Sequence, residues 1–145
     1  MFVSVTRLRI RSIRFMPQFL LRTLLAQRQT ARAAGFVTGK LLVDRDRTYW
    51  TLTVWESEQA MKKFRGAGAH RKVMRKLPRW CNEAAYAHWI TDSTDIPAWS
   101  DAYDRLVAEG KLSRVDHPAP EHQSREFRRP RLDPEVGQPI KPSSK

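Results

Sequence analysis

The most informative stretch of the sequence is Thr48-Tyr-Trp-Thr-Leu-Thr-Val-Trp55. Its residues are almost all aromatic or β-branched, a composition typical of a β-strand. Because successive side chains of a strand point to opposite faces, Tyr49 shares a face with Trp55, whereas Trp50 shares the other face with Leu52. Both faces of this strand carry large apolar groups, and we therefore expect both to be buried.

Three elements are predicted before this strand. Residues 3–10 alternate and are rich in β-branched residues, which indicates a half-buried strand. Apolar residues then recur at spacings of three and four from Phe15 onward, which predicts a helix that has Pro17 in its first turn and stops at Gly35. Residues 36–43 alternate loosely and form a second strand, paired with residues 48–55 as a hairpin.

Three further elements are predicted after it. A helix begins at Ser57, and we expect it to bend or break at Gly66 and Gly68 and to end at Pro78. Residues 84–90 form a fourth strand, and a third helix follows from Pro97 to about residue 110. The order β-α-β-β-α-β with an extra C-terminal helix is the signature of a ferredoxin-like α+β sandwich.

The chain of 145 residues suits one domain, which we place at 1–112. Six of the nine prolines lie in residues 113–145, where large apolar residues are few. We therefore expect residues 113–145 to be a mostly disordered tail that can lie against the domain near Phe127.

Composition excludes several classes of protein. Cys81 is the single cysteine, so no internal disulfide can form, and the spacing of Cys and His residues fits no zinc site. Charge-free runs are far shorter than the roughly 20 residues that span a bilayer, and we expect a cytoplasmic protein without a membrane span. Phosphate loops, dinucleotide fingerprints and hydrolase triads are not recognisable in the sequence.

The net charge of +12 is unevenly distributed, because 18 of the 27 Lys and Arg residues lie in residues 1–79. Such a basic surface predicts either a solvated face or an anionic partner, and nucleic acid is a minor alternative. Arg7 and Arg9 share one face of the first strand, where they are either solvated or able to clamp an acidic group.

Residues 52–58 (LTVWESE), a strand that ends in Trp55 and runs into a helix, together with Met61, Phe64 and Gly68-Ala-His70, resemble the dimeric α/β-barrel superfamily. This superfamily includes the antibiotic biosynthesis monooxygenases and haem-degrading relatives. The chain is most similar to uncharacterised monooxygenase-like proteins and to spheroidene monooxygenase, through residues 70–80 (HRKVMRKLPRW). The resemblance covers about residues 2–112.

The resemblance implies a homodimer whose sheets pack face to face, with a pocket between sheet and helices in each subunit. His70 matches the position of the histidine that holds haem iron in the haem-degrading members. Thr6 and Phe64 stand where those members use an Asn and a Trp. Haem is therefore possible, with His70 as the metal ligand, and a cofactor-free oxygenase remains open.

His70 is the candidate catalytic residue, because its imidazole can ligate haem iron or act as a general base. The glycines just before it permit close approach of a flat ligand. A core or dimer-interface histidine is the alternative, and for His88 a structural role is favoured. Trp55, Phe64, Tyr86 and Thr6 are the candidate pocket residues, although core packing explains the aromatics equally well.

The sequence thus predicts a monooxygenase-like homodimer that acts on a hydrophobic or planar organic molecule. The alternative is a non-catalytic dimer with a ligand-binding or structural role.

Overall fold

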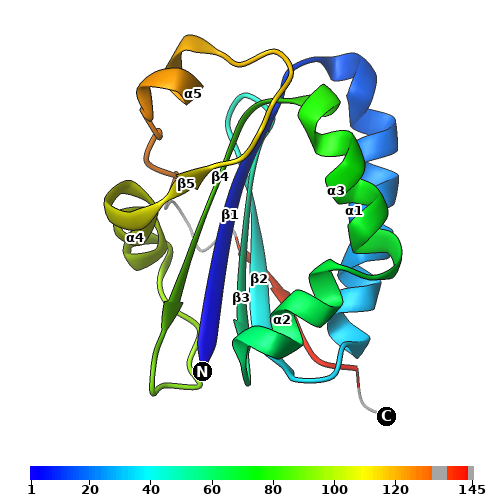
Figure 1. Ribbon diagram of the computed structural model, residues 1–145, viewed down its shortest axis with the longest axis vertical. Helices are drawn as coiled ribbons and strands as arrows, with labels where there is room; N and C mark the ends of the chain where they lie inside the picture. Colours follow the sequence, from blue (N-terminus) through cyan, green and yellow to red (C-terminus); the bar gives the residue numbers. More distant parts are fainter. Residues whose placement is uncertain (132–136, 144–145) are drawn as a thin grey trace.

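A six-stranded antiparallel sheet forms the centre of the computed structural model, which describes residues 1–131 and 137–143 (Figure 1). The strand order is β5-β4-β1-β3-β2-β6, so β1 and β3 are central. The strands are β1 (Phe2–Ile10), β2 (Phe36–Asp44), β3 (Thr48–Trp55), β4 (Cys81–Ile90), β5 (Lys111–Leu112) and β6 (Gly137–Ile140). The order β4-β1-β3-β2 of the inner strands, joined by helices after β1 and β3, confirms the predicted ferredoxin-like sandwich.

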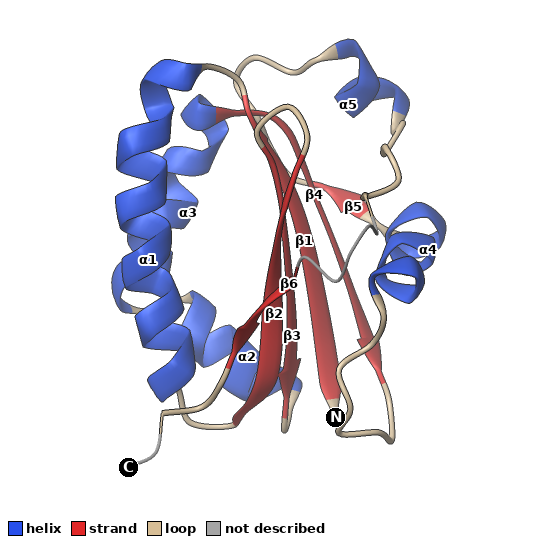
Figure 2. Ribbon diagram, turned by 180° about the vertical axis from the view of Figure 1, so that it is seen from behind, coloured by secondary structure: helices blue, strands red, loops and turns tan. Residues whose placement is uncertain are grey.

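One face of the sheet carries the helix layer, which consists of η1 (Ile13–Phe15), α1 (Met16–Arg32), α2 (Glu58–Arg65) and α3 (Gly68–Trp80) (Figure 2). The predicted break falls between α2 and α3, where Gly68 adopts a positive φ of 57°. Pro78 does not end the helix as expected, since α3 continues to Trp80. Pro78 lies in the last turn of α3, and the helix continues past it to Trp80, which is buried against Phe19.

The opposite face is covered by the chain itself. Helix α4 (Trp99–Glu109) lies over it, and Ala102 and Leu106 of this helix join Trp50 and Leu52 of β3 in a buried cluster. The sequence led us to expect that another subunit buries this face. In the structure this face is instead buried within one chain, by the amphipathic helix α4 that follows the fourth strand.

The expectation of a mostly disordered tail is also corrected for the described residues. Residues 113–131, which we call the strap, contain α5 (Pro120–Ser124) and bring Phe127 into the cluster under α4. Beyond the strap, β6 pairs with β2 and buries Ile140. Prolines interrupt regular structure here but still allow an extended chain to lie on the sheet. Residues 132–136 and 144–145 of the predicted tail lie outside the described residues.

Candidate functional site

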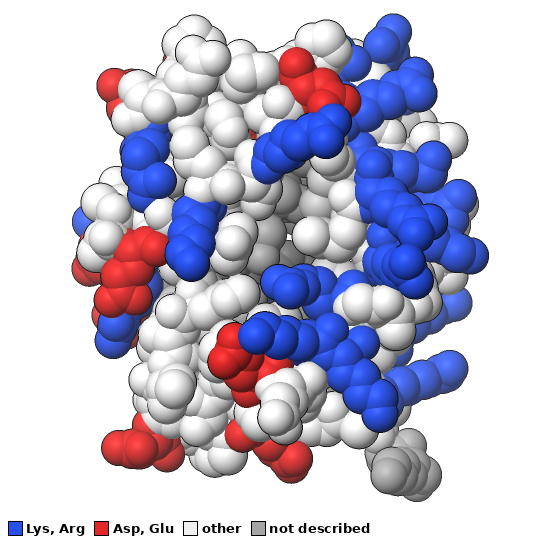
Figure 3. Space-filling view, viewed as in Figure 1, with Lys and Arg blue, Asp and Glu red and all other residues white. Residues whose placement is uncertain are grey.

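The face of the sheet below the helix layer is only partly covered. Pairing of Thr6 with Thr51 and Tyr86 on the neighbouring strands places these three side chains on that face, because paired residues point the same way. They are half-buried, as are Ser4 and His88 on the same face. Figure 3 shows the surface hollowed between the sheet and the helix layer. We refer to this hollow, with its floor of Ser4, Thr6, Thr51, Tyr86 and His88, as the cleft.

His70 lies in the first turn of α3, in the helix layer on the same side of the sheet as the cleft. Its backbone N–H donates to the side-chain oxygen of Gln29 at 2.8 Å, and its ring Nδ1 lies 3.3 Å from the carbonyl oxygen of Arg65. A carbonyl only accepts hydrogen bonds, so Nδ1 carries the proton in this contact and Nε2 keeps a free lone pair. No hydrogen bond from a described residue reaches Nε2.

Burial lowers the pKa of His70, and the positive charge of Arg65 lowers it further, against the opposing effect of the Arg65 carbonyl. The positive end of the α3 dipole acts in the same direction. His70 is therefore neutral near pH 7. A neutral imidazole with a free Nε2 can accept a proton or ligate a metal.

An aromatic ladder connects His70 to the sheet. The ring of Phe64 lies 4.7 Å from that of His70 and 5.0 Å from that of Trp55, which in turn contacts Phe36 at 5.3 Å. Phe64 is half-buried, whereas Trp55 is 0% exposed and donates its indole N–H to Thr53 at 2.9 Å. Trp55 therefore supports Phe64 from behind rather than offering a surface to a ligand.

His88 is a residue of the cleft for which sequence analysis favoured a structural role. Its ring lies 5.1 Å from Tyr86 and 5.2 Å from Phe2, on the floor of the cleft. Burial lowers the pKa of His88, and Arg65 lowers it as well. Residues two apart in a strand share a face, so His88 lies on the same face as Tyr86. This period could have predicted His88 as a residue of the same site.

The structure therefore divides the predicted site residues into two groups. His70, Phe64 and Trp55 are in consecutive contact, and Thr6 and Tyr86 are paired neighbours on the floor. The positive charge of Arg65 lowers the pKa of both His70 and His88. The cleft brings all five predicted residues to one side of the sheet.

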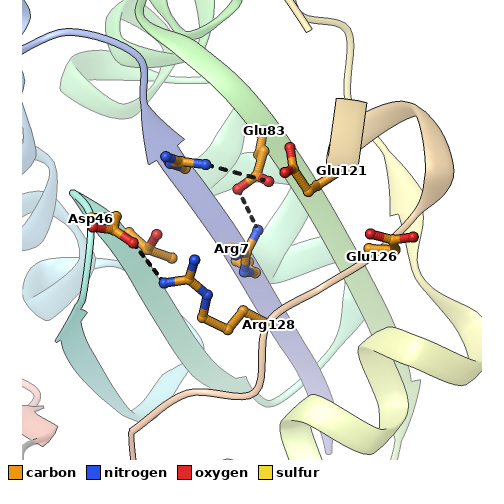
Figure 4. Close-up of a pocket in the computed structure, with 8 residues that line it drawn as sticks. Arg7, Asp46, Glu83, Glu121, Glu126 and Arg128 are labelled. Atoms are coloured by element: carbon orange, nitrogen blue, oxygen red, sulfur yellow. Dashed lines mark hydrogen bonds and ion pairs between the residues drawn. The ribbon is translucent and has the colours of Figure 1, made fainter. Parts of the chain in front are cut away.

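Arg7 and Arg9 lie on the other side of the sheet, in a charged cavity of about 50 Å³ under the strap (Figure 4). Arg7 is 4% exposed and donates to Glu83 at 3.1 Å, while Arg9 approaches the same carboxylate at 3.9 Å. Arg128 of the strap pairs with Asp46 at 2.6 Å. The cavity is large enough for a few waters, and the pair of Arg128 with Asp46 fastens the strap to the turn between β2 and β3.

The described residues hold no group of three or more His, Cys, Asp and Glu side chains that could bind a metal. Cys81 is buried, and burial raises the pKa of its thiol to about 12, so it is neither a thiolate ligand nor a nucleophile near pH 7. If haem were bound, the Nε2 of His70 would hold its iron, because Nδ1 is already paired with the Arg65 carbonyl oxygen.

The comparisons with known proteins agree with this geometry. A family model described as "Domain of unknown function (DUF3291)" matches residues 14–119. The chain belongs to this family. The match of the DUF3291 model extends past residue 112 into the strap. No curated protein matches the chain.

Solved structures show the same fold at low identity. SnoaB, a cofactor-independent oxygenase from Streptomyces nogalater, is 18% identical with a TM-score of 0.53, covering 63% of this chain and 93% of that one. An antibiotic biosynthesis monooxygenase is 10% identical with a TM-score of 0.55, covering 64% and 98%. A conserved protein from Methanosarcina mazei Go1 is 10% identical with a TM-score of 0.56, covering 63% and 92%. The predicted resemblance to monooxygenase-like proteins is thus confirmed at the level of the fold.

Within residues 1–131 and 137–143, each helix is too short or too polar to cross a bilayer.

Proposed function

We propose that the protein binds a hydrophobic, planar organic molecule in the cleft and oxidises it with molecular oxygen, with His70 as the general base. The observation that carries the proposal is a neutral His70 with a free Nε2 in the helix layer, on the side of the sheet that has a half-buried, partly polar floor. Phe64 and Tyr86 offer aromatic surfaces for a flat ligand, and Thr6 offers a hydroxyl group. The likeness to a cofactor-independent oxygenase supports this class of reaction.

The proposed reaction needs no external reductant. His70 takes a proton from an acidic CH₂ group of the substrate, and the electron-rich carbanion then reduces O₂. One oxygen atom enters the product as a carbonyl group and the other leaves as water, so the CH₂ group supplies all four electrons. Pairing of Nδ1 with the Arg65 carbonyl orients the ring and stabilises the imidazolium that forms.

Oxygen consumption with a planar polycyclic substrate that carries an acidic CH₂ group tests the proposal. We expect turnover by the unaltered protein and a loss of at least a hundredfold in kcat for His70→Ala, the size typical of a missing general base. The exposed His117 provides the matched control, and His117→Ala should keep the full rate. Equal rates for His70→Ala and the unaltered protein would remove His70 from the mechanism.

The pH profile gives a second readout. Because burial lowers the pKa of His70, the rate should fall on acidification with a midpoint below the usual histidine value of about 6.5. A midpoint above that value would contradict the proposed base.

Haem is tested separately, by titrating haem into the protein and into His70→Ala and recording absorption spectra. A saturable Soret shift at one haem per chain, lost in the variant, would replace the cofactor-free reaction by a haem-dependent one. Binding of the planar substrate without oxygen uptake would instead favour a non-catalytic ligand-binding protein.

The cytoplasmic location stays a prediction. The homodimer also stays a prediction of the sequence, although α4 and the strap cover the sheet face through which its face-to-face form would associate.

A further inference from the structure

The solvent side of α1 is unusually apolar. Leu20, Leu21, Leu24 and Leu25 are 51%, 59%, 47% and 39% exposed, whereas Phe19 and Ala26 of the same helix are buried. Leu20 and Leu24 are one turn apart, as are Leu21 and Leu25, so the four form a continuous patch. Contiguous exposed apolar side chains mark an interaction surface rather than ordinary solvent contact.

The patch lies within a strongly basic layer. Helices α1, α2 and α3 carry eleven Lys and Arg residues and one acidic residue, Glu58. Glu58 is neutralised by Lys62 at 2.8 Å, and α1 and α3 contain no acidic residue. Figure 3 shows Lys and Arg side chains gathered over this side of the molecule. The occupant of the leucine patch must therefore tolerate or carry negative charge.

We propose that the helix layer docks on the surface of an anionic lipid membrane. Exposed leucines flanked by Arg and Lys are the combination that binds a bilayer interface, because the apolar side chains enter the acyl boundary while the cations meet lipid phosphates. Long Arg and Lys side chains can extend to the headgroups while their stems lie along apolar surface. On the opposite side, α4 has three acidic residues and one basic residue, and the strap has three acidic residues and five arginines, so this side attracts an anionic membrane less than the helix layer does.

Two other occupants fit less well. A second copy of the chain would bring two strongly basic layers together, and their repulsion opposes association. Nucleic acid is attracted by the charge, but leucines neither stack on bases nor bond to their edges, so the patch would stay unused. The membrane surface is the occupant that uses both features.

Co-sedimentation of the full-length protein with vesicles tests the proposal. We expect binding to phosphatidylcholine vesicles that contain about one third phosphatidylglycerol, and at least tenfold weaker binding to pure phosphatidylcholine. Leu21→Ser with Leu25→Ser should weaken binding to the anionic vesicles at least tenfold. Val107→Ser is the matched control, since Val107 is an equally exposed apolar residue of α4, and it should bind like the unaltered protein.

Several outcomes would overturn the proposal. One is equal binding to neutral and anionic vesicles, or binding to neither. Another is a leucine variant that binds vesicles fully while its circular dichroism is unchanged. Binding to a short DNA duplex but not to vesicles would assign the layer to nucleic acid. A doubled mass in light scattering, lost in the leucine variant, would assign the patch to a second copy.

Discussion

At the scale of single residues, Arg7 and Glu83 form an ion pair in which both side chains are buried. Burial lowers the pKa of Arg7, and the charge of Glu83 opposes that shift and keeps the guanidinium ionised. Both side chains are about 5% exposed, and the Nε of Arg7 has no partner among the described residues. Removing the carboxylate would leave a buried charge with little compensation.

We therefore expect Glu83→Gln to lower the free energy of unfolding by about 3 to 5 kcal/mol, measured by urea denaturation. Glu109→Gln is the control, because its ion pair with Arg105 is about half exposed and should contribute about 0 to 1 kcal/mol. Similar small losses for both variants would show that the Arg7–Glu83 pair is solvated.

His122 makes stability depend on pH. Its Nδ1 accepts a hydrogen bond from the backbone N–H of Ala84 at 3.2 Å, and burial lowers its pKa. The folded state therefore binds fewer protons than the unfolded state near the unfolded pKa of about 6.5, so stability is present above that pH and falls as pH drops through it. Burial also lowers the pKa of His70 and His88, which adds to the effect.

We expect His122→Gln to reduce the loss of stability between about pH 7 and 5, since Gln can accept the same bond without titrating. Urea denaturation at several pH values measures this slope. His117→Gln, at an exposed position, should keep the slope of the unaltered protein. An unchanged slope in His122→Gln would mean that other groups carry the pH dependence.

Residue chemistry explains why the sequence placed His70 near a helix start but did not predict the burial of Arg7. The glycines before His70 mark a helix start, and the structure places His70 in the first turn of α3. Arg7 was expected either in solvent or in a ligand clamp, because an alternating strand does not reveal whether it is central. Pairing of β1 on both sides, and α4 over its second face, decide its burial.

At the scale of elements, Gln29 joins α1 to the break between α2 and α3. Its amide donates to the carbonyls of Ala67 at 2.8 Å and Phe64 at 3.3 Å, and its oxygen accepts from His70. A Cβ at Gly68 would lie 3.1 to 3.2 Å from the Gln29 side chain. A larger residue at position 68 would therefore require the Gln29 side chain to shift.

Gln29→Ala should therefore lower the free energy of unfolding by about 1 to 3 kcal/mol and speed hydrogen exchange at the His70 amide. Urea denaturation and amide exchange measure both effects. Gln18→Ala, on the exposed side of the same helix, should change neither. Unchanged exchange at His70 would show that the helix break holds its shape without Gln29.

Helix and strand periods predicted the inner elements but not what covers each face. Gly66 and Gly68 marked the helix break because glycine weakens a helix wherever it stands. The apolar side of α4 was also recognisable, yet periodicity does not name the surface on which it packs. The strap was harder to predict, because one buried aromatic, Phe127, anchors a segment whose composition otherwise indicates disorder.

At the scale of the whole molecule, cover of the second sheet face determines whether chains can associate as in a dimeric α/β barrel. Face-to-face packing needs the surface of Trp50 and Leu52, which are 0% exposed beneath α4 and Phe127. The strap is fastened by Arg128 to Asp46 and by the hydroxyl of Tyr103, which donates to the Phe127 carbonyl at 3.2 Å. A sheet-to-sheet dimer must first displace this cover.

We therefore expect light scattering at micromolar concentration to give the mass of one chain, 16.9 kDa.

Phe127→Ala removes a buried ring, which costs about 3 to 5 kcal/mol for a fully buried Phe. If that cost is met by release of the strap, hydrogen exchange should rise within residues 113–131 and the average mass should increase as the apolar face becomes available. Arg114→Ala, at an exposed strap position whose pair with Asp116 is local, should leave both measurements unchanged. A doubled mass for the unaltered chain with a protected strap would mean that the subunits meet through a different surface, and the sheet face would then be a closed core in every state of the protein.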